Sequence, residues 1–523
     1  MSIDELPYSF VASGKIAVDY LNYTGPIREV FHNHFREPKI REFSGNREEI
    51  IDKLFDYNKR INAPKTVMKN IHLLSQTNTY AIITGQQPGI FSGPLYTIYK
   101  AISAITLCEK LSNPKHPLVP IFWNASEDHD FAEINHVTIF KQNEPINIYY
   151  TGKSRGVAFS HLRLNKTAAK KMLSEIDLVT PRSEFKRKLL SEIEGFIHTS
   201  DNMGEFFSRF MTHILGKFGL VMIEPGFVRE LMTPIFARLI RNPIECTRIL
   251  AETSAKLGKF GYKPKIHKKS NICNFFIIND KGKRLQVTHK GDFHCARDTY
   301  SQKELLKLLN ENPSAFSANA IIRPITQDLL FPTFGYVAGS NEIEYFAQLT
   351  GMYYFFSMEM PVIFPRFGAT IVEKKIRKVM KKYNAEILEF KNPEKLLKKL
   401  AKGRIEDVFK SFKNRILISM DKIAKKAVTI DKTLLASSYL TRGKILREVE
   451  ALENKVAAQL KENDLLARQQ IYKTFNNLFP NQHLQERQIN VLEYLIKFGD
   501  RFLRTVHEEF SKSRYGAHKV IEC

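Results

Sequence analysis

Residues 80–110 of the chain read YAIITGQQPGIFSGPLYTIYKAISAITLCEK, and this stretch decides the fold. Four apolar or aromatic residues at 80–83 precede a glycine-rich segment, which is typical of a buried parallel strand. Gly85, Gly89 and Gly93 permit backbone angles and close approaches that side chains would block. Apolar residues then recur at helical spacing. The stretch therefore predicts a strand, a glycine loop and a helix, the repeating unit of α/β folds.

The junction between this loop and the helix is a candidate anion site. We expect Pro94 at the first helical position, with Ser92 or Gly93 as its cap. Unpaired backbone N–H groups at the positive end of a helix commonly hold a phosphate or carboxylate. The glycine spacing matches neither GxGxxG nor GxxxxGK[ST], however, and glycine-rich turns also serve structural purposes. The pattern alone leaves anion binding and a structural turn equally open.

A polar cluster follows the next predicted strand, residues 118–123. Glu127, Asp128, His129 and Asp130 lie directly after it. Parallel strands joined by a helix bring their carboxyl ends to one edge of the sheet, so we expect this cluster beside the glycine loop. Three acids around a histidine offer acid/base capacity, a carboxylate to orient the imidazole, and oxygen ligands for hydrated magnesium. The alternative is a helix N-terminus stabilised by acidic residues.

Other predicted strand ends also carry charged groups. A third strand ends in Glu224, which either contacts a ribose or begins the following helix. Arg323 and Arg366 each follow an apolar run, and a guanidinium binds a carboxylate or phosphate through two parallel hydrogen bonds. Surface salt bridges are the alternative for both arginines. Gly335 and Gly339 bracket a predicted turn in the same region.

Interruptions of this pattern define the expected organisation, an α/β protein with a parallel-sheet core, two inserted modules and a C-terminal antiparallel coiled coil. The expected parts are 1–138 with 201–254 and 318–370 for the core, 139–200 and 255–317 for the inserted modules, 371–470 for the helical coiled-coil domain, and 471–523 for C-terminal helices that return to the core. Apolar residues spaced by threes and fours predict two long helices separated near Asp431. Their seam favours self-association, with packing onto the core as the alternative.

Composition excludes several classes of protein. The 523 residues are 43% hydrophobic and 26% charged, as in soluble globular proteins of two or three domains. No basic and apolar leader begins the chain, and no apolar run approaches the ~18 residues that cross a bilayer, so we expect a cytoplasmic protein with no membrane partner. The five cysteines are scattered, and His289, His294 and Cys295 lack a convincing fourth ligand, so no metal site is expected.

The formal net charge of +24 raises the question of a polyanionic partner. Residues 371–415 hold 15 Lys or Arg against 6 Asp or Glu, and their four aromatic residues do not alternate regularly with the basic ones. A solvated helix face is the simpler interpretation, and a polyanion-binding face is the alternative. We therefore do not expect nucleic acid as a partner.

Four long motifs occur in a fixed order: TGQQPGIFSGPLYTIYKAISAI, PIFWNASEDHDFAEINHV, IIRPITQDLLFPTFGYVAGSNEIEYFAQL and FPNQHLQER. On the basis of these motifs, the sequence resembles the bacillithiol biosynthesis cysteine-adding enzyme family over most of its length. The resemblance implies a Rossmann-like core, a coiled coil that makes a homodimer, and the last step of bacillithiol synthesis, in which the carboxyl group of cysteine joins the amine of glucosaminyl malate. It also implies ATP or ADP binding, with magnesium accompanying the nucleotide as an option.

These expectations give each motif a hypothetical role. ATP would activate cysteine as an acyl-adenylate or acyl-phosphate, and the sugar amine would then attack. The cofactor-binding residues would be Gly85, Gln86, Gln87, Gly89 and Gly93. The catalytic residues would be Asp128 or His129 as proton acceptor and Asp130 as the group that orients His129. The substrate-binding residues would be Glu127, Arg323 and Arg366, with the two arginines receiving the malyl carboxylates. The alternatives are a nucleotide-binding dimeric scaffold and a nucleotidyltransferase acting near nucleic acid.

Overall fold

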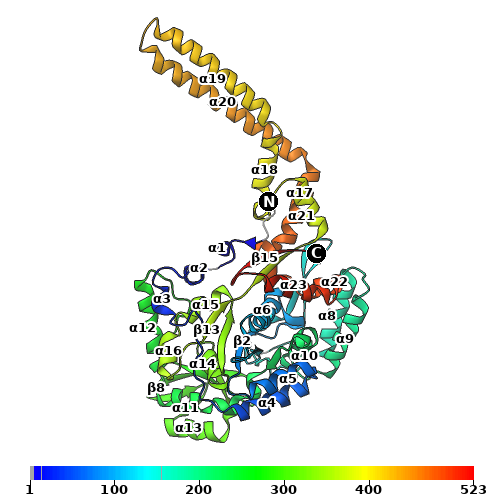
Figure 1. The fold of residues 1–523 in the computed structure, drawn as a ribbon, viewed down its shortest axis with the longest axis vertical. Coiled ribbons are helices and arrows are strands. Elements are labelled where there is room, and N and C mark those ends of the chain that lie inside the picture. Colours follow the sequence, from blue (N-terminus) through cyan, green and yellow to red (C-terminus); the bar gives the residue numbers. More distant parts are fainter. Residues whose placement is uncertain (1–4, 13, 155) are drawn as a thin grey trace.

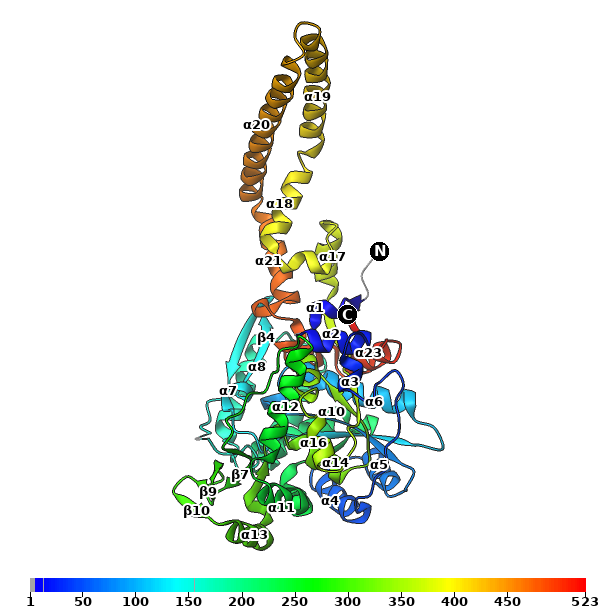
Figure 2. The same ribbon diagram turned by 90° about the vertical axis from the view of Figure 1, so that its left-hand side faces the viewer.

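The computed structural model describes residues 5–12, 14–154 and 156–523. The chain forms a rounded body from which a long helical hairpin projects (Figure 1), and the view at right angles shows the same division (Figure 2). Within the described residues, no helix combines the length and apolarity needed to span a bilayer.

A five-stranded sheet with strand order β13-β12-β2-β3-β6 forms the centre of the body. Its strands are β2 (Tyr80–Gln86), β3 (Leu118–Asn124), β6 (Val221–Ile223), β12 (Thr333–Ala338) and β13 (Val362–Pro365). All neighbouring pairs are parallel. The predictions of an α/β class and of strands at residues 80, 118, 219 and 361 are therefore confirmed.

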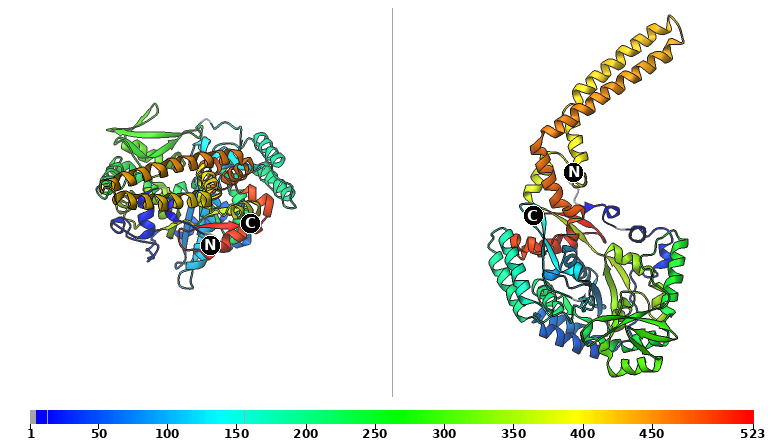
Figure 3. Two further views of the ribbon diagram at one scale, coloured as in Figure 1. Left: turned by 90° about the horizontal axis from the view of Figure 1, so that it is seen from above. Right: turned by 180° about the vertical axis from the view of Figure 1, so that it is seen from behind.

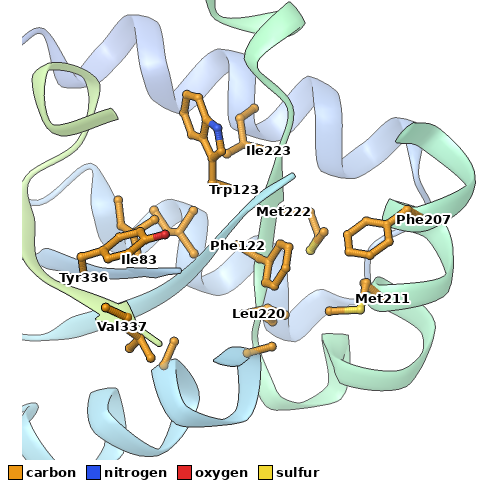
Figure 4. Close-up of a cluster of buried hydrophobic side chains, with 14 of the residues drawn as sticks. Ile83, Phe122, Trp123, Phe207, Met211, Leu220, Met222, Ile223, Tyr336 and Val337 are labelled. Atoms are coloured by element: carbon orange, nitrogen blue, oxygen red, sulfur yellow. The ribbon is translucent and has the colours of Figure 1, made fainter. Parts of the chain in front are cut away.

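Large side chains from both faces of these strands are buried, as a parallel sheet covered on both sides requires. Figure 4 shows one such cluster, in which Phe122 of β3 lies beside Met222 and faces Phe207 and Met211 of α10 (Met203–Leu215). The ring centroids of Phe122 and Phe207 are 5.7 Å apart. This packing explains why uninterrupted apolar runs, rather than alternating patterns, mark the strands.

The stretch that decides the fold has the expected order of elements. Strand β2 leads into a loop with one turn of 3-10 helix, η1 (Ile90–Ser92), and then into α6 (Leu95–Leu111), which packs on β2 and β3. The expected cap is wrong, because Pro94 itself is the N-cap residue and Leu95 is the first helical residue. Pro94 lacks an N–H and its ψ of 157° is extended, which suits the position just before the helix.

The predicted turn between Gly335 and Gly339 is wrong at its first residue. Gly335 lies inside the buried strand β12. A Cβ atom there would lie 2.4 Å from the ring of Phe364 on β13, so the position needs glycine for close packing rather than for a turn. Gly339 is the N-cap residue of the next helix, α15 (Ser340–Phe346).

Helices surround the sheet and bury its faces. Besides α6, α10 and α15, the helices of the body include α1 (Tyr8–Val11), α2 (Lys15–Asn22), α3 (Ile27–Val30), α4 (Arg47–Arg60), α5 (Lys65–Leu74), α11 (Thr233–Arg241), α12 (Glu245–Lys259), α14 (Arg323–Leu330) and α16 (Thr350–Phe355). Helices α4 and α5 contact β6.

Two modules interrupt the sheet between its strands. The first contains α7 (Phe131–Ile134), the hairpin β4 (His136–Lys141) and β5 (Glu144–Tyr149), and the helices α8 (Lys166–Val179) and α9 (Lys186–Thr199). The second is an antiparallel sheet of β7 (Ile272–Ile278), β8 (Arg284–Lys290), β9 (Asp292–Cys295), β10 (Asp298–Tyr300) and β11 (Phe316–Ala318), with α13 (Gln302–Glu311). The expected boundaries at residues 138 and 317 pass through β4 and β11.

The C-terminal part begins with β14 (Gly368–Val372) and leaves the body. Its helices are α17 (Lys374–Lys382), α18 (Pro393–Gly403), α19 (Glu406–Val428), α20 (Leu434–Asn463) and α21 (Leu465–Leu478). Helices α19 and α20 form the projecting antiparallel hairpin, which the views from above and behind also show (Figure 3). The predicted pair of long helices separated near Asp431 is confirmed.

The chain then returns to the body through α22 (Leu492–Phe498) and α23 (Arg501–Ser511). It ends in a strand that was not expected, β15 (His518–Glu522). This strand pairs with β14 and with β1 (Glu5–Leu6), so the two ends of the chain meet in a three-stranded sheet. The sequence HKVIE does not by itself predict a strand at residues 518–522. The strand forms because it pairs with segments about 150 and 500 residues away in the sequence.

Candidate active site

A cavity of about 940 Å³ opens at the carboxyl ends of the parallel strands. Its walls come from the segments that follow the strands, from the second inserted module and from the C-terminal segment at residues 483–488. This is the edge at which open α/β sheets bind ligands, and the volume suits a substrate of several hundred daltons.

Most residues singled out from the sequence lie on this cavity. They are Gly85, Gln86, Gln87, Glu127, Asp128, His129, Arg323 and Arg366. The parallel strand order brings them together, although Gly85 and Arg366 are 281 positions apart in the sequence. Gly89, Gly93 and Asp130 do not line the cavity.

Gly89 and Gly93 are buried against each other. A Cβ atom on Gly89 would lie 2.7 Å from the Cα atom of Gly93, so glycine serves close packing here. The start of α6 is covered as well, because the Leu95 N–H donates to the carbonyl of Ile489 over 2.8 Å. The Asn490 side chain donates to the carbonyl of Gly93 over 2.7 Å. Of the two interpretations of the junction, these contacts favour a structural turn.

Asp128 is the centre of the polar cluster after β3. Its Oδ2 accepts a hydrogen bond from Gln87 Nε2 at 2.6 Å, and its Oδ1 accepts one from the His129 N–H at 2.7 Å. His129 Nδ1 lies 3.7 Å from Asp128 Oδ1. Asp130 is exposed at the start of the short helix α7. The carboxylate beside the His129 ring is therefore that of Asp128, and no contact recorded among the described residues supports the orienting role expected for Asp130.

Glu127 forms part of the wall rather than a free acid. Its carboxylate accepts from Arg229 Nε at 2.7 Å and from Ser317 Oγ at 2.9 Å. Arg229 and Ser317 are buried, and Arg229 also donates to the carbonyl of Ser314. Through Ser314 and Ser317, these hydrogen bonds connect the loop after β3 to the second inserted module. They therefore fix the shape of the cavity wall.

A buried ion pair that the sequence reasoning missed lies next to β2. Lys100 Nζ is 2.7 Å from Glu342 Oε2 and donates to the carbonyl of Gly85 at 2.6 Å. Burial lowers the pKa of Lys100, an effect that Glu342 opposes. Burial alone would raise the pKa of Glu342, but Lys100 and other donors bring it below its usual value. The sequence did contain a sign of this ion pair, because Lys100 is the only charged residue between Leu95 and Cys108 of the predicted helix.

The two predicted arginines have different surroundings. Arg366 makes a two-pronged ion pair with the buried Glu486, with nitrogen-to-oxygen distances of 2.9 and 2.5 Å. Arg323 contacts the hydroxyl groups of Tyr345 at 3.1 Å and Tyr336 at 3.4 Å. It makes no direct ion pair with a carboxylate of the described residues, and the nearby Glu342, which helps to raise its pKa, is already paired with Lys100.

Glu224, His289, His294 and Cys295 do not line this cavity. The Glu224 carboxylate is buried and accepts hydrogen bonds from Tyr57 Oη at 2.5 Å and Ser126 Oγ at 2.6 Å. It directly precedes the 3-10 helix η3 (Pro225–Phe227) and does not line the cavity, which favours the helix-start interpretation over a ribose contact. Across residues 5–12, 14–154 and 156–523, no group of three or more His, Cys, Asp or Glu side chains is arranged to hold a metal ion.

These features define a class of protein: a Rossmann-like α/β domain with a charged cavity at its strand ends, followed by a coiled-coil domain. Residues 1–367 match the family domain described as "Bacillithiol biosynthesis BshC, N-terminal Rossmann-like domain". Residues 369–523 match "Bacillithiol biosynthesis BshC, C-terminal coiled-coil domain". The chain belongs to the BshC family of bacillithiol biosynthesis.

Curated relatives match almost the whole chain. One from Salinibacter ruber is 32% identical over 91% of this chain and 89% of its own length. One from Desulforamulus reducens is 29% identical over 88% and 87% of the two chains. One from Bacillus anthracis is 28% identical over 97% and 98%. Each bears the name "Putative cysteine ligase BshC".

Proposed function

We propose that the protein is a cysteine ligase that joins the carboxyl group of cysteine to the amine of glucosaminyl malate, as the last step of bacillithiol biosynthesis. The observation that carries this proposal is the cavity at the strand ends, where Arg323 makes no direct ion pair with a carboxylate of the described residues, in a member of a family whose relatives bear the name "Putative cysteine ligase BshC". A substrate that carries carboxylates would supply the missing charge.

The two arginines then have different roles in substrate binding. Arg323 receives a malyl carboxylate, because its charge is available, whereas Arg366 is already neutralised by Glu486 and positions the wall. Asp128 and His129 meet the amine of the sugar, since they stand together at the end of β3. Gln86 and Gln87 offer amide groups to either substrate from the end of β2.

Amide formation from a free carboxylate is uphill in water, so a nucleoside triphosphate would supply the activation. The donor set fits a nucleotide, because Arg284 and Arg487 line the same cavity and guanidinium groups hold phosphates through paired hydrogen bonds. Magnesium would arrive with the nucleotide, since it binds through phosphate oxygens and only one or two carboxylates, and Asp128 is a partly exposed carboxylate of the cavity.

We also propose a cytoplasmic homodimer formed through the projecting hairpin. The hairpin carries a series of exposed apolar side chains, which are Val408, Phe412, Ile418, Ile423, Ile430, Leu434, Leu435, Tyr439, Leu440, Ile445 and Leu452. A second copy would bury these side chains. Ordinary monomers expose apolar residues singly rather than in a series of this length. The free cysteines suit a reducing compartment.

The test combines purified protein with ATP, cysteine and glucosaminyl malate and searches for bacillithiol by mass spectrometry. We expect product that depends on all three substrates. Arg323→Lys should raise the KM for glucosaminyl malate by about 10- to 100-fold, since lysine keeps the charge but loses the fork that binds a carboxylate. The proposal fails if folded protein forms no amide with ATP or another nucleoside triphosphate, or if Arg323→Lys leaves the KM unchanged.

A further inference from the structure

Lys268 occupies an unusual position on the wall that the second inserted module contributes to the cavity. It lies in the segment between α12 and β7 and is partly buried. Its Nζ donates to the carbonyl of Cys273 at 2.7 Å and to Asn274 Oδ1 at 2.6 Å. Neither acceptor is charged, and Lys268 makes no ion pair with any carboxylate of the described residues.

The surrounding network fixes the orientation of both acceptors. Asn274 is fully buried, and its Nδ2 donates to Thr247 Oγ1 at 3.1 Å. The Thr247 hydroxyl donates in turn to the carbonyl of Ile272, so Oγ1 must accept from Asn274. Asn319, which lines the cavity, donates to Asn274 Oδ1 at 3.1 Å. Asn274 therefore presents its oxygen, not its nitrogen, to Lys268.

This geometry suits an amine that changes its protonation state. A neutral amine has two N–H bonds, which satisfy the two acceptors, and one lone pair that remains for a third partner. A protonated lysine would instead have a third N–H without a partner in the described residues. Burial lowers the pKa of Lys268 to about 8, against the opposing influence of the thiols of Cys273 and Cys246. Arg284 and His267 line the same wall and add no negative charge.

The other candidate acceptors are less suitable. Both oxygens of Asp128 already accept hydrogen bonds, from Gln87 and from the His129 N–H. The His129 side chain is 44% exposed. Water therefore competes for its ring, whereas Lys268 is partly buried.

We propose that Lys268 is the base that takes the proton from the substrate amine during amide formation. This inference rests on the proposed ligase function. The new C–N bond forms between the amine nitrogen and the carbonyl carbon of activated cysteine. The bond from that carbon to the leaving group supplied by a nucleoside triphosphate breaks, and its electron pair departs with the leaving group. The proton released from nitrogen passes to Lys268 Nζ, which becomes an ammonium group.

The first test compares three variants in the bacillithiol assay. Lys268→Met should lower kcat by about 10²- to 10⁴-fold, the range typical of general base catalysis, and Lys268→Arg should be equally slow because arginine stays protonated. The matched control is Lys269→Met, which removes an exposed neighbouring lysine and should keep the wild-type rate. A wild-type rate in Lys268→Met would overturn the inference while leaving the ligase function intact.

The second test separates a base from a structural lysine. Asn274→Asp places a carboxylate against Nζ, which should raise the pKa of Lys268 and move the acid limb of the pH–kcat profile up by about one pH unit or more. The limb arises because Lys268 cannot accept a proton once it is protonated at low pH. The substrate amine contributes a limb of its own that this variant does not move. An unmoved profile in a folded Asn274→Asp enzyme would overturn the inference.

A third measurement distinguishes failure of this inference from failure of the proposed function. The rate at which acetic anhydride labels Lys268, followed by mass spectrometry at several pH values, should titrate near pH 8 in the free protein and at higher pH in Asn274→Asp. Lys269 is the internal reference and should titrate near the ordinary lysine value of about 10.4. If Lys268 of the wild-type protein titrates near pH 8 but the protein forms no amide, the ligase function is refuted and, with it, this role for Lys268. Titration of Lys268 together with Lys269 refutes the inference directly.

Discussion

Lys100 shows how one residue couples the fold to the cavity. Its side chain is 2% exposed and its Nζ holds the carbonyl of Gly85 and the carboxylate of Glu342, which links the end of β2 to the start of α15. Glu342 in turn accepts from the Tyr336 hydroxyl at 2.7 Å and from the Gly339 N–H at 2.8 Å. Loss of either charge would leave its partner buried and uncompensated.

Replacement of Lys100 therefore tests this link. Lys100→Met should lower the free energy of unfolding by about 3 kcal/mol, because it strands a buried carboxylate. Urea titration followed by the fluorescence of Trp123, the single tryptophan and a residue of β3, measures the effect. The double variant Lys100→Met/Glu342→Gln should regain part of the loss. Equal stability of the single variant and wild type would refute the ionic pairing.

His518 predicts a pH dependence at the same scale. It is buried beside Glu486, and its Nε2 lies 2.9 Å from Thr370 Oγ1. Burial lowers its pKa from the ordinary 6.5 to about 4, with Arg366 acting in the same direction and Glu486 against it. The neutral ring therefore stabilises the folded state above pH 6.5, and this contribution is lost as the pH falls from 6.5 towards 4.

We expect the free energy of unfolding to fall by about 2 kcal/mol between pH 7 and pH 5 on account of His518. Urea unfolding at the two pH values measures this loss. His518→Gln can keep a contact to Thr370 but cannot titrate, so its stability should change less over the same interval. Parallel pH dependences of the two proteins would show that His518 does not titrate as proposed.

At the scale of elements, the segment at residues 485–490 decides what the glycine loop does. It returns after the coiled coil and covers the loop, with Asn490 donating to the carbonyls of Phe91 and Gly93. Phe91 and Ser92 have positive φ angles of 49° and 77°, a conformation that side chains rarely adopt, so this cover holds a strained loop in place. The strand, loop and helix could be predicted locally, whereas the cover lies about 400 residues away in sequence.

Asn490→Ala tests the importance of this cover. Two buried carbonyls lose their donor, so the free energy of unfolding should fall by about 2–3 kcal/mol. The Leu95 amide should also exchange its hydrogen faster, because its bond to the Ile489 carbonyl depends on the same segment. Asn476→Ala, on α21 and away from the loop, is the control. Unchanged exchange at Leu95 would show that the loop is stable without the cover.

At the scale of the whole molecule, the hairpin presents apolar residues far from the body (Figure 1). Ile423 on α19 is 55% exposed and Leu440 on α20 is 66% exposed. Burying such side chains stabilises an association by about 1.5–3 kcal/mol each. The proposed dimer would bury these side chains, whereas an isolated hairpin leaves them in water.

The pair Ile423→Glu/Leu440→Glu should therefore raise the dimer dissociation constant by 10²-fold or more, because charges enter an apolar contact. Sedimentation velocity over a range of concentrations measures it. Leu178→Glu, an exposed leucine of α8 outside the hairpin, should leave the association unchanged. A wild-type protein that stays monomeric at high concentration would refute a dimer, and an unaffected pair variant would exclude this surface.

The sequence by itself determined the elements whose signals are local: the strands at residues 80, 118 and 221, the glycine loop, and the long helices of the hairpin, because apolar periodicity and glycine act within a few residues. It also indicated that the groups after these strands share one edge, since parallel topology requires it. Tertiary structure alone decided that Glu486 neutralises Arg366, that Lys100 pairs with Glu342, that β15 is a strand, and that Asn274 fixes Lys268 at the cavity. Those outcomes depend on burial and on partners distant in sequence, which no local pattern records.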